Sequence, residues 1–281
     1  MEIIVKKEGE LLDYLVNNTE MSRKNLKKYL VHKSIYVNNS SISQYNYKVY
    51  PGNKIFIDTN SKSSLKLPFT VLFEDEHIIV VDKPAGLLTI ATDKEKEKTL
   101  YHMVREYLVS KDKRNKVFIV HRLDKDTSGV VIFSKDEKTK NLLQDNWNEF
   151  VKLREYTLVC HGHLEKESGR IVNYLKETKT KLVYTTNKDK GIEAITNYKV
   201  IKTNDKYSLV SVFLETGRRN QIRVAFSDME NPIVGDKVYG IKDSESRLYL
   251  HANRLKLYYP YIKKDILFES KNPIEFKKIM K

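Results

Sequence analysis

The chain has 281 residues, with 51 Lys and Arg against 37 Asp and Glu, so its formal net charge is +14 at pH 7. No apolar run approaches the roughly 20 residues that cross a bilayer, and a single cysteine excludes an internal disulfide. A membrane-spanning protein and a disulfide-stapled secreted domain are therefore excluded. The positive excess predicts a polyanionic partner, with a merely basic soluble protein as the alternative.

The first residues, 1–7, do not have a basic segment followed by a long apolar core, so we expect no signal peptide. The single cysteine, Cys160, also argues against secretion, because proteins of oxidising compartments commonly have cysteines that pair in disulfides. We therefore expect a cytoplasmic protein.

Residues 1–58 are predicted to form a small first domain. Apolar residues within 11–16 have helical spacing, and a second helix is predicted to begin at Arg23 behind a capping Ser22. A strand over 35–37, a turn at 38–39 and a strand over 54–57 complete a helix-helix-hairpin pattern. The second helix carries the candidate phosphate-binding residues Arg23, Lys24, Lys27 and Lys28. A solvated helix face is the alternative.

Residues 59–68 are rich in Ser, Asn and Lys and are predicted to be a linker to a larger domain over 69–281. That domain begins with apolar runs at 71–73 and 78–82, which predict strands. The segment 83–87, Lys-Pro-Ala-Gly-Leu, turns the chain sharply and is interpreted as a support for a cleft. Thr99 is predicted to cap a helix from Leu100 to about Leu108.

The stretch 121–129 reads His-Arg-Leu-Asp-Lys-Asp-Thr-Ser-Gly between two apolar runs, 117–120 and 130–133, that predict buried strands. Polar loops held on rigid strands are common places for catalytic side chains. From these residues alone, an exposed Asp-rich turn is the equal alternative.

A helix is predicted over 137–150, with Leu142, Leu143, Trp147 and Phe150 facing the core. We expect Trp147, the sole tryptophan, to be a core residue instead of a base-stacking one. A strand follows over 154–160. Cys160, His161 and His163 invite a metal site, but neighbouring strand residues point to opposite faces, so we expect no metal.

Two more strands are predicted over 194–201 and 207–214. They lead into 215–224, which reads Glu-Thr-Gly-Arg-Arg-Asn-Gln-Ile-Arg-Val. Further segments at 232–236, 239–240 and 248–252 read Pro-Ile-Val-Gly-Asp, Tyr-Gly and Leu-Tyr-Leu-His-Ala. The chain contains no Walker phosphate loop, no G-x-G-x-x-G and no zinc signature.

The stretch 121–129 resembles the active-site motif of the RluA family of pseudouridine synthases, His-Arg-Leu-Asp, two residues, then Thr-Ser-Gly. Segments 83–87 and 215–224 also resemble family motifs, and the resemblance covers about residues 70–281. Where the family commonly reads Thr-Gly-Arg-Thr-His-Gln-Ile-Arg-Val-His, this chain departs from it at Arg219, Asn220 and Ala225. Those departures bear on how RNA is contacted and on which site is modified.

The resemblance implies a catalytic domain built on a mostly antiparallel mixed sheet with flanking helices. It implies that Asp124 is the catalytic aspartate, that Arg223 pairs with it, and that Tyr156 lies on the uracil. Taken alone, Tyr156 would be an ordinary half-buried strand tyrosine. The residues expected to contact the substrate are Arg122, Ile222, Arg218 and Arg219. Arg219 and Arg223 are four apart and would share a helix face. The reaction implies no cofactor and no metal.

The first domain resembles the S4-like, or alphaL, RNA-binding domain through Ser22-Arg23, Lys27-Lys28 and Val37-Asn38. We therefore expect an α+β protein, monomeric and not membrane-bound, that isomerises uridine in structured RNA. Ribosomal RNA is the expected substrate by analogy, and transfer RNA stays open. The rival is a non-catalytic RNA-binding or ribosome-assembly factor on the same scaffold. A nucleoside hydrolase would need a metal-binding Asp cluster that the chain lacks.

Overall fold

The computed structural model describes residues 1–31, 34–59, 67–93 and 95–281. The chain divides into two compact units, Met1–Leu67 and Pro68–Lys281. This division falls inside the predicted linker 59–68, of which residues 60–66 lie outside the described ranges. Within those ranges, no helix has both the length and the apolar character needed to cross a membrane.

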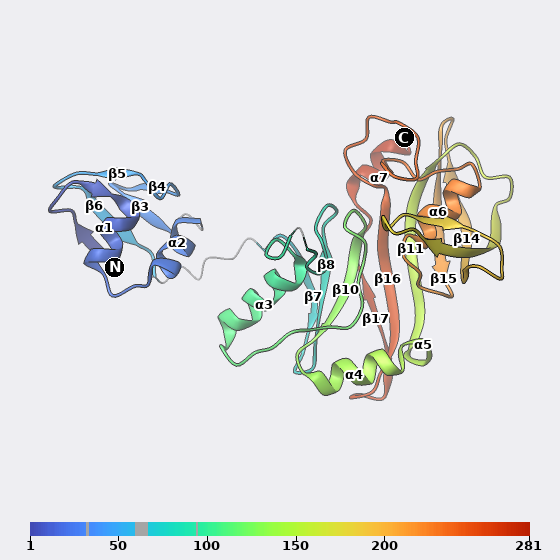
Figure 1. Cartoon of the computed structure of the whole chain (residues 1–281), viewed down its shortest axis with the longest axis horizontal. Helices are drawn as coiled ribbons and strands as arrows, with labels where there is room; N and C mark the ends of the chain where they lie inside the picture. The colour runs from blue at the N-terminus through green and yellow to red at the C-terminus, as the bar shows by residue number, and fades with distance from the viewer. Residues whose placement is uncertain (32–33, 60–66, 94) are drawn as a thin grey trace. The chain divides into compact units, whose positions relative to one another are not determined.

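The first unit packs two helices on a small antiparallel sheet (Figure 1). The predicted helices are α1, Leu11–Asn18, and α2, Arg23–Val31, and Ser22 Oγ accepts the Asn25 N–H at 3.3 Å, which confirms the cap. The sheet has the order β1 (Glu2–Ile4), β6 (Lys54–Ile57), β3 (Ile35–Val37) and β4 (Ser40–Ile42), and β2 (Gly9–Glu10) pairs with β5 (Lys48–Val49). The helix-helix-hairpin pattern is confirmed.

The second unit is built on one 11-stranded sheet. Its main path runs β13 (Val183–Thr185), β12 (Ser168–Glu177), β14 (Ile192–Thr203), β15 (Tyr207–Leu214), β11 (Val151–His161), β16 (Leu250–Tyr259), β10 (Ser128–Ser134), β8 (Ile78–Lys83) and β7 (Thr70–Glu74). β17 (Lys264–Glu269) pairs with β16, and β9 (Phe118–Ile119) pairs with β10. In the described part of the chain, β10 and β16 are parallel and the other neighbours antiparallel, so the mostly antiparallel mixed sheet is confirmed.

The parallel contact between β10 and β16 explains one glycine of the central motif. Gly129 pairs with Ala252 and has φ +118, a conformation that favours glycine. A Cβ at Gly129 would lie 2.1 Å from the Ala252 carbonyl oxygen. The close approach of the two strands therefore requires glycine directly after the loop that carries Asp124.

Among the described residues, five helices flank the large sheet: α3 (Leu100–Lys111), α4 (Glu137–Asp145), α5 (Trp147–Phe150), α6 (Gln221–Asp228) and α7 (Ile274–Ile279). Thr99 caps α3 as predicted, accepting the His102 N–H at 3.2 Å. The prediction of one helix over 137–150 is wrong. Asn146, with φ −107 and ψ 20, breaks it into α4 and α5, so the Trp147 side chain does not follow the periodicity of α4.

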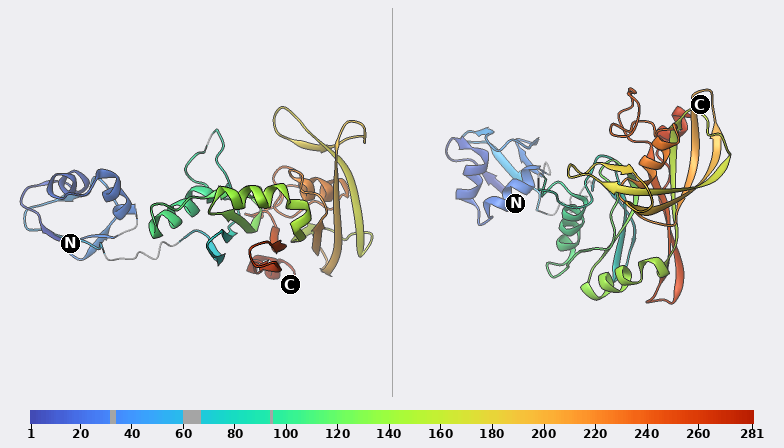
Figure 2. Two further views of the ribbon diagram at one scale, coloured as in Figure 1. Left: turned by 90° about the horizontal axis from the view of Figure 1, so that it is seen from below. Right: turned by 45° about the vertical axis from the view of Figure 1, so that its right-hand side comes forward.

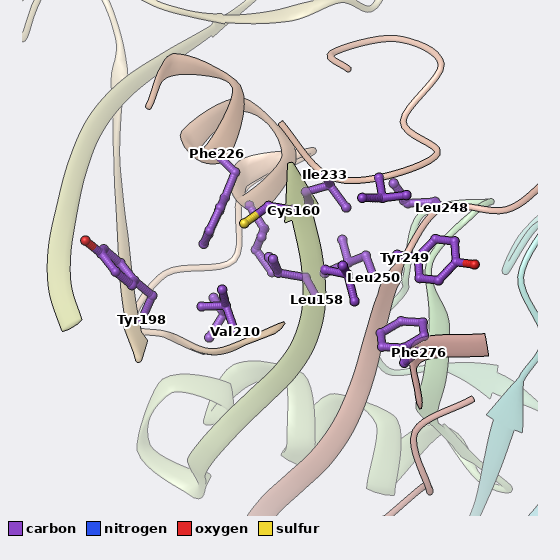
Figure 3. Packing of buried hydrophobic residues seen from close by; sticks show 14 of the residues in the cluster. Leu158, Cys160, Tyr198, Val210, Phe226, Ile233, Leu248, Tyr249, Leu250 and Phe276 are labelled. Atoms are coloured by element: carbon purple, nitrogen blue, oxygen red, sulfur yellow. The ribbon is translucent and has the colours of Figure 1, made fainter. Parts of the chain in front are cut away.

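A buried apolar cluster positions α6 against the sheet. Phe226 of α6 packs with Leu158 and Cys160 of β11 and with Tyr198 of β14 (Figure 3). In both views of Figure 2, the orange helix α6 lies beside the yellow and orange strands of the sheet. Because Phe226 is fully buried, α6 cannot slide, and the residues at its N-terminal end are held next to β11.

Candidate active site

The loop between β9 and β10 is tied to the preceding part of the domain by its backbone. Thr89 Oγ1 donates to the Leu123 carbonyl at 2.7 Å and accepts the Leu123 N–H at 3.2 Å. The buried Lys83 Nζ donates to the Lys125 carbonyl at 2.9 Å. His121 Nε2 accepts the Ile132 N–H at 3.1 Å. Asp124 therefore lies on a loop fixed on both sides, which suits a side chain that must be aimed.

Lys83 also donates to the carbonyls of Pro84, at 3.1 Å, and Leu87, at 2.7 Å. Burial lowers the pKa of Lys83 to about 7, although the nearby carboxylates of Asp126 and Asp124 act in the opposite direction. The segment 83–87 was predicted to support the cleft, and its residue Lys83 contacts the loop that carries Asp124.

Asp124 opens onto a cavity of about 300 Å³. All of the predicted catalytic and substrate-contacting residues line it except Arg219: they are Arg122, Asp124, Tyr156, Arg218, Ile222 and Arg223. The other walls come from His121, Leu123, Thr127, Trp147, Arg154, Leu214, Gly217, Asn220, Gln221 and Leu250. The fold thus gathers residues from four separate segments of the sequence around one carboxylate.

The electrostatic surroundings of Asp124 act on its pKa in two directions. Burial raises the pKa, because removal from water penalises the charged form. The positive charges of Arg223, Arg122, Arg219 and Lys83, in that order, lower it in part, and the net direction is upward. Arg223 is thus the cation that acts most strongly on the Asp124 carboxylate.

The prediction that Arg223 forms a direct ion pair with Asp124 is wrong. Arg223 Nε and Nη2 donate to both carboxylate oxygens of Asp236, at 2.7 and 2.6 Å, and Nη1 donates to Asn220 Oδ1 at 3.2 Å. The guanidinium also lies 5.0 Å from the centre of the Tyr239 ring. In the described chain, Arg223 therefore acts on Asp124 through its charge, while Asp236 fixes its position.

The helix face expected for Arg219 and Arg223 does not exist, because α6 begins at Gln221. Asn220, just before it, has φ +53, a conformation that Asn tolerates better than most residues. Arg219 lies outside the cavity, half-exposed, and donates to Glu177 Oε1 at 2.9 Å. Ala225, the third departure from the family pattern, is fully buried in α6.

Gln221 holds the segment before α6 in place. Its amide oxygen accepts from Thr216 Oγ1 at 2.8 Å and from the Arg218 N–H at 2.9 Å. Its Nε2 donates to the Ile195 carbonyl and to Thr196 Oγ1, both at 2.9 Å. Gln221 is buried, so these bonds satisfy its amide and fix the loop that carries Arg218.

Tyr156 and Arg154 reach the cavity from the same face of β11, as strand neighbours two apart must. Burial raises the pKa of Tyr156 to about 12, and the Asp124 charge adds to the shift, so the phenol keeps its proton at neutral pH. Arg154 was not predicted to be a site residue. Its spacing from Tyr156 was the signal that could have identified it.

Trp147 was expected in the core, and this prediction is only partly correct. It packs against the apolar cluster that contains Leu143 and Leu255, yet it is half-buried and lines the cavity. Its ring centre lies 4.9 Å from that of His121. Burial lowers the pKa of His121 to about 4, with help from the Arg154 charge, so this wall is a neutral aromatic surface.

The three side chains considered as metal ligands lie in separate surroundings. Cys160 is buried, His161 Nε2 lies 3.0 Å from Asp243 Oδ2, and His163 Nε2 lies 2.7 Å from the Asn204 carbonyl oxygen. Across the described residues, no group of three His, Cys, Asp or Glu side chains could hold a metal ion.

The predicted RNA-binding residues of α2 are all exposed: Arg23, Lys24, Lys27 and Lys28. Arg23 Nη1 lies 2.7 Å from Asp13 Oδ1, and Lys27 Nζ lies 5.5 Å from the centre of the Tyr45 ring. Both contacts are on the surface and would cost little to exchange for a phosphate contact.

The fold is thus an α+β architecture in which the carboxylate of Asp124 lines a cavity under the positive charge of nearby guanidinium groups. Residues 77–228 match the family model described as RNA pseudouridylate synthase, which is more than half of the chain. The chain belongs to this family and is an RNA pseudouridine synthase, an isomerase.

Individual relatives agree. The chain is 30% identical to an RNA pseudouridine synthase named YhcT from Bacillus subtilis, over 99% of this chain and 96% of that protein. It is 29% identical to ribosomal large subunit pseudouridine synthase D from Buchnera aphidicola, over 97% and 93% of the two chains. The relatives support the RluA type. The fold resembles human RNA pseudouridylate synthase domain containing 4, with a TM-score of 0.62, 20% identity, and coverage of 74% of this chain and 90% of that one.

Proposed function

We propose that Asp124 carries the isomerisation. The observation behind this is that Asp124 supplies the carboxylate among the described residues that line a cavity, where four guanidinium groups also lie. Pseudouridine formation breaks the bond between uracil N1 and ribose C1′, turns the base, and joins C1′ to uracil C5, which then loses a proton. An ionised Asp124 serves this reaction either as a nucleophile at the sugar or as a base that generates a glycal.

The other residues of the cavity have distinct proposed roles. The charge of Arg223, which acts on Asp124 most strongly, favours the ionised carboxylate. Ile222, which is almost fully buried, packs against the uracil. Tyr156 keeps its own proton at neutral pH, so its role is to stack on the uracil and to assist proton transfer at carbon 5 through its hydroxyl. This reaction involves no redox change and no metal.

A uridine inside folded RNA must leave its stack before it can enter the cavity. Arg122 is exposed, lines the cavity and has the reach to fill the gap or bind a phosphate. Arg218 is exposed at the same opening and is proposed to bind the backbone. Arg219 is proposed to contribute a phosphate contact through the guanidinium nitrogens that do not donate to Glu177.

We further propose that the first unit is an S4-like RNA-binding domain that uses the basic face of α2. Ribosomal RNA is the proposed substrate, because relatives such as the Borreliella burgdorferi protein are named ribosomal large subunit pseudouridine synthase D. A cytoplasmic, monomeric enzyme fits this substrate. Transfer RNA is the alternative outcome of the mapping experiment below.

The test compares two isosteric substitutions on one loop. Asp124→Asn should abolish pseudouridine formation and leave RNA binding nearly unchanged, because it removes a charge and keeps the shape. Asp126→Asn, an exposed control two residues away, should keep most of the activity. Each protein is restored to cells that lack the gene, and pseudouridines are mapped in ribosomal and transfer RNA. An Asp124→Asn protein that restores the sites at a near-normal rate would refute the assignment. No gene-dependent site in either RNA would favour the non-catalytic rival.

A further inference from the structure

A second cavity of about 480 Å³ lies beside the first. The two cavities share five lining residues: Trp147, Arg154, Leu214, Gly217 and Arg218. The second cavity adds residues that do not line the first, among them Asn148, Lys152 and Glu215. Asp124 and Tyr156 are not among its lining residues. A chain of connected groups could therefore occupy both cavities at once, with only one of them next to the catalytic carboxylate.

The second cavity carries positive charge that the protein does not neutralise. In the described part of the chain, no carboxylate pairs with Lys152, Arg154 or Arg218. Each donates instead to a backbone carbonyl: Lys152 to Glu149 at 2.7 Å, Arg154 to Glu215 at 2.6 Å and Arg218 to Glu193 at 3.1 Å. Such contacts orient the cations and leave their charge available to an anion.

The one acidic side chain that lines the second cavity is already engaged. Glu215 Oε1 and Oε2 accept from Arg170 at 3.1 and 3.2 Å, and Oε1 also accepts from Asn197 at 2.8 Å. Its backbone carbonyl, and not its carboxylate, is what holds Arg154. The cavity thus presents three cations against one carboxylate whose charge is compensated from outside.

Gly217 makes room for this arrangement. A Cβ at Gly217 would lie 2.7 Å from Arg154 Nη1, so any larger residue would push the guanidinium away from the boundary between the cavities. Arg154 and Arg218 are also near enough for the positive charge of Arg218 to lower the pKa of Arg154, in addition to the larger effect of burial. Two guanidiniums held close together without a carboxylate are a site for a phosphate, which can accept from both.

Trp147 supplies an aromatic wall shared by the two cavities. It is half-buried, so part of its ring faces the cavities while the rest packs on the protein. Proteins that bind single-stranded RNA combine a basic groove with aromatic rings on which bases stack. Trp147 next to Lys152 and Arg154 has this combination.

We propose that the second cavity binds the nucleotide adjoining the target uridine, with its phosphate between Arg154 and Arg218, its base on Trp147, and its outer phosphate near Lys152. This proposal rests on the proposed function, because it takes the first cavity as the uridine site. It assigns the second cavity to a flanking single-stranded nucleotide, so the RNA must be unpaired there when it binds.

The sole tryptophan makes the test direct, because Trp147 fluorescence reports the shared wall. The probe is pentauridylate, titrated at several salt concentrations into the full-length protein, Lys152→Gln and Lys138→Gln. Lys138 is exposed on α4 and lines neither cavity, so it is the matched control. Wild type and Lys138→Gln should show quenching. Lys152→Gln should bind roughly threefold or more weakly at 0.1 M salt, with a log–log salt slope shallower by about 0.7, one single-strand phosphate contact.

Two outcomes would overturn the proposal: equal affinity and salt slope for Lys152→Gln and Lys138→Gln, or pentauridylate binding that leaves Trp147 fluorescence unchanged. The same wild-type preparation is assayed for pseudouridine formation in ribosomal and transfer RNA. If it is active while either outcome is observed, the second-cavity assignment fails and the proposed function stands. If it forms no pseudouridine in any RNA, both fail.

Discussion

Replacing Arg223 should change stability and catalysis through two different carboxylates. Arg223 is 7% exposed, and its partner Asp236 is 2% exposed. In Arg223→Gln the Asp236 carboxylate keeps its bonds from the Val238 and Tyr239 N–H groups, but it loses its cation. Breaking a buried pair from one side costs about 3–5 kcal/mol. For a unit of this size, that corresponds to a melting temperature lower by roughly 6–20 °C.

The loss of stability should depend on pH in a defined direction. Burial acts against the charged form of Asp236, but the hydrogen bonds and charge of Arg223 outweigh it, so the pKa of Asp236 lies below its ordinary value. A depressed carboxyl pKa contributes stability above the unfolded pKa, and this contribution is lost as pH falls through the folded pKa. The gap in melting temperature between wild type and Arg223→Gln should therefore narrow as pH falls towards and below about 3.9.

Catalysis should respond through Asp124. Without Arg223 the pKa of Asp124 rises further, so the acid limb of kcat/KM moves to higher pH. Asp236→Asn is the matched variant: it also disrupts the pair, but it keeps the cation beside Asp124. Arg223→Lys should restore only part of the activity, because Lys lacks the planar fork that holds Asp236.

Calorimetry and a pH–rate profile on ribosomal RNA measure the two effects separately. A melting temperature for Arg223→Gln equal to wild type would show that the pair with Asp236 does not stabilise the protein. An acid limb that does not move, in a variant that remains folded at the assay temperature, would show that Arg223 does not control the charge of Asp124.

Two further predictions concern the loop and the first unit. Lys83→Met should lower turnover by on the order of 100-fold, because it releases the loop that aims Asp124. In wild type, the free energy of unfolding should rise between pH 7 and about 10.4, because over that range Lys83 is deprotonated in the folded protein and protonated in the unfolded one. Lys83→Met should abolish this rise. Calorimetric profiles that are the same for both proteins would count against this. Deleting residues 1–62 should weaken RNA binding and flatten its salt slope while turnover at saturating RNA largely survives. An unchanged slope would mean that α2 merely faces solvent, and a folded but inactive truncation would mean that the first unit helps to build the site.

Helices, strands and caps that depend on neighbouring residues can be predicted from the sequence alone. The apolar, β-branched segments at 130–133 and 207–214 correspond to β10 and β15, as predicted, because such residues favour strands. Ser22 and Thr99 cap their helices as predicted, because a capping side chain accepts from a backbone N–H only three residues further along the chain. The central motif placed Asp124 on a loop between strands, and the structure agrees.

Contacts between charged groups that are distant in the sequence depend on how the folded chain packs. Arg223 and Asp236 are 13 residues apart, and their contact depends on how the chain turns after α6, which no local pattern encodes. Because the helix is interrupted at Asn146, Trp147 lines two cavities instead of lying on the predicted core-facing side of one long helix. Arg154 lies far from Gly217 and Arg218 in the sequence, and no local pattern links the three residues. They form one boundary because β11 and the segment before α6 pack side by side, and such packing depends on the whole sheet and its core.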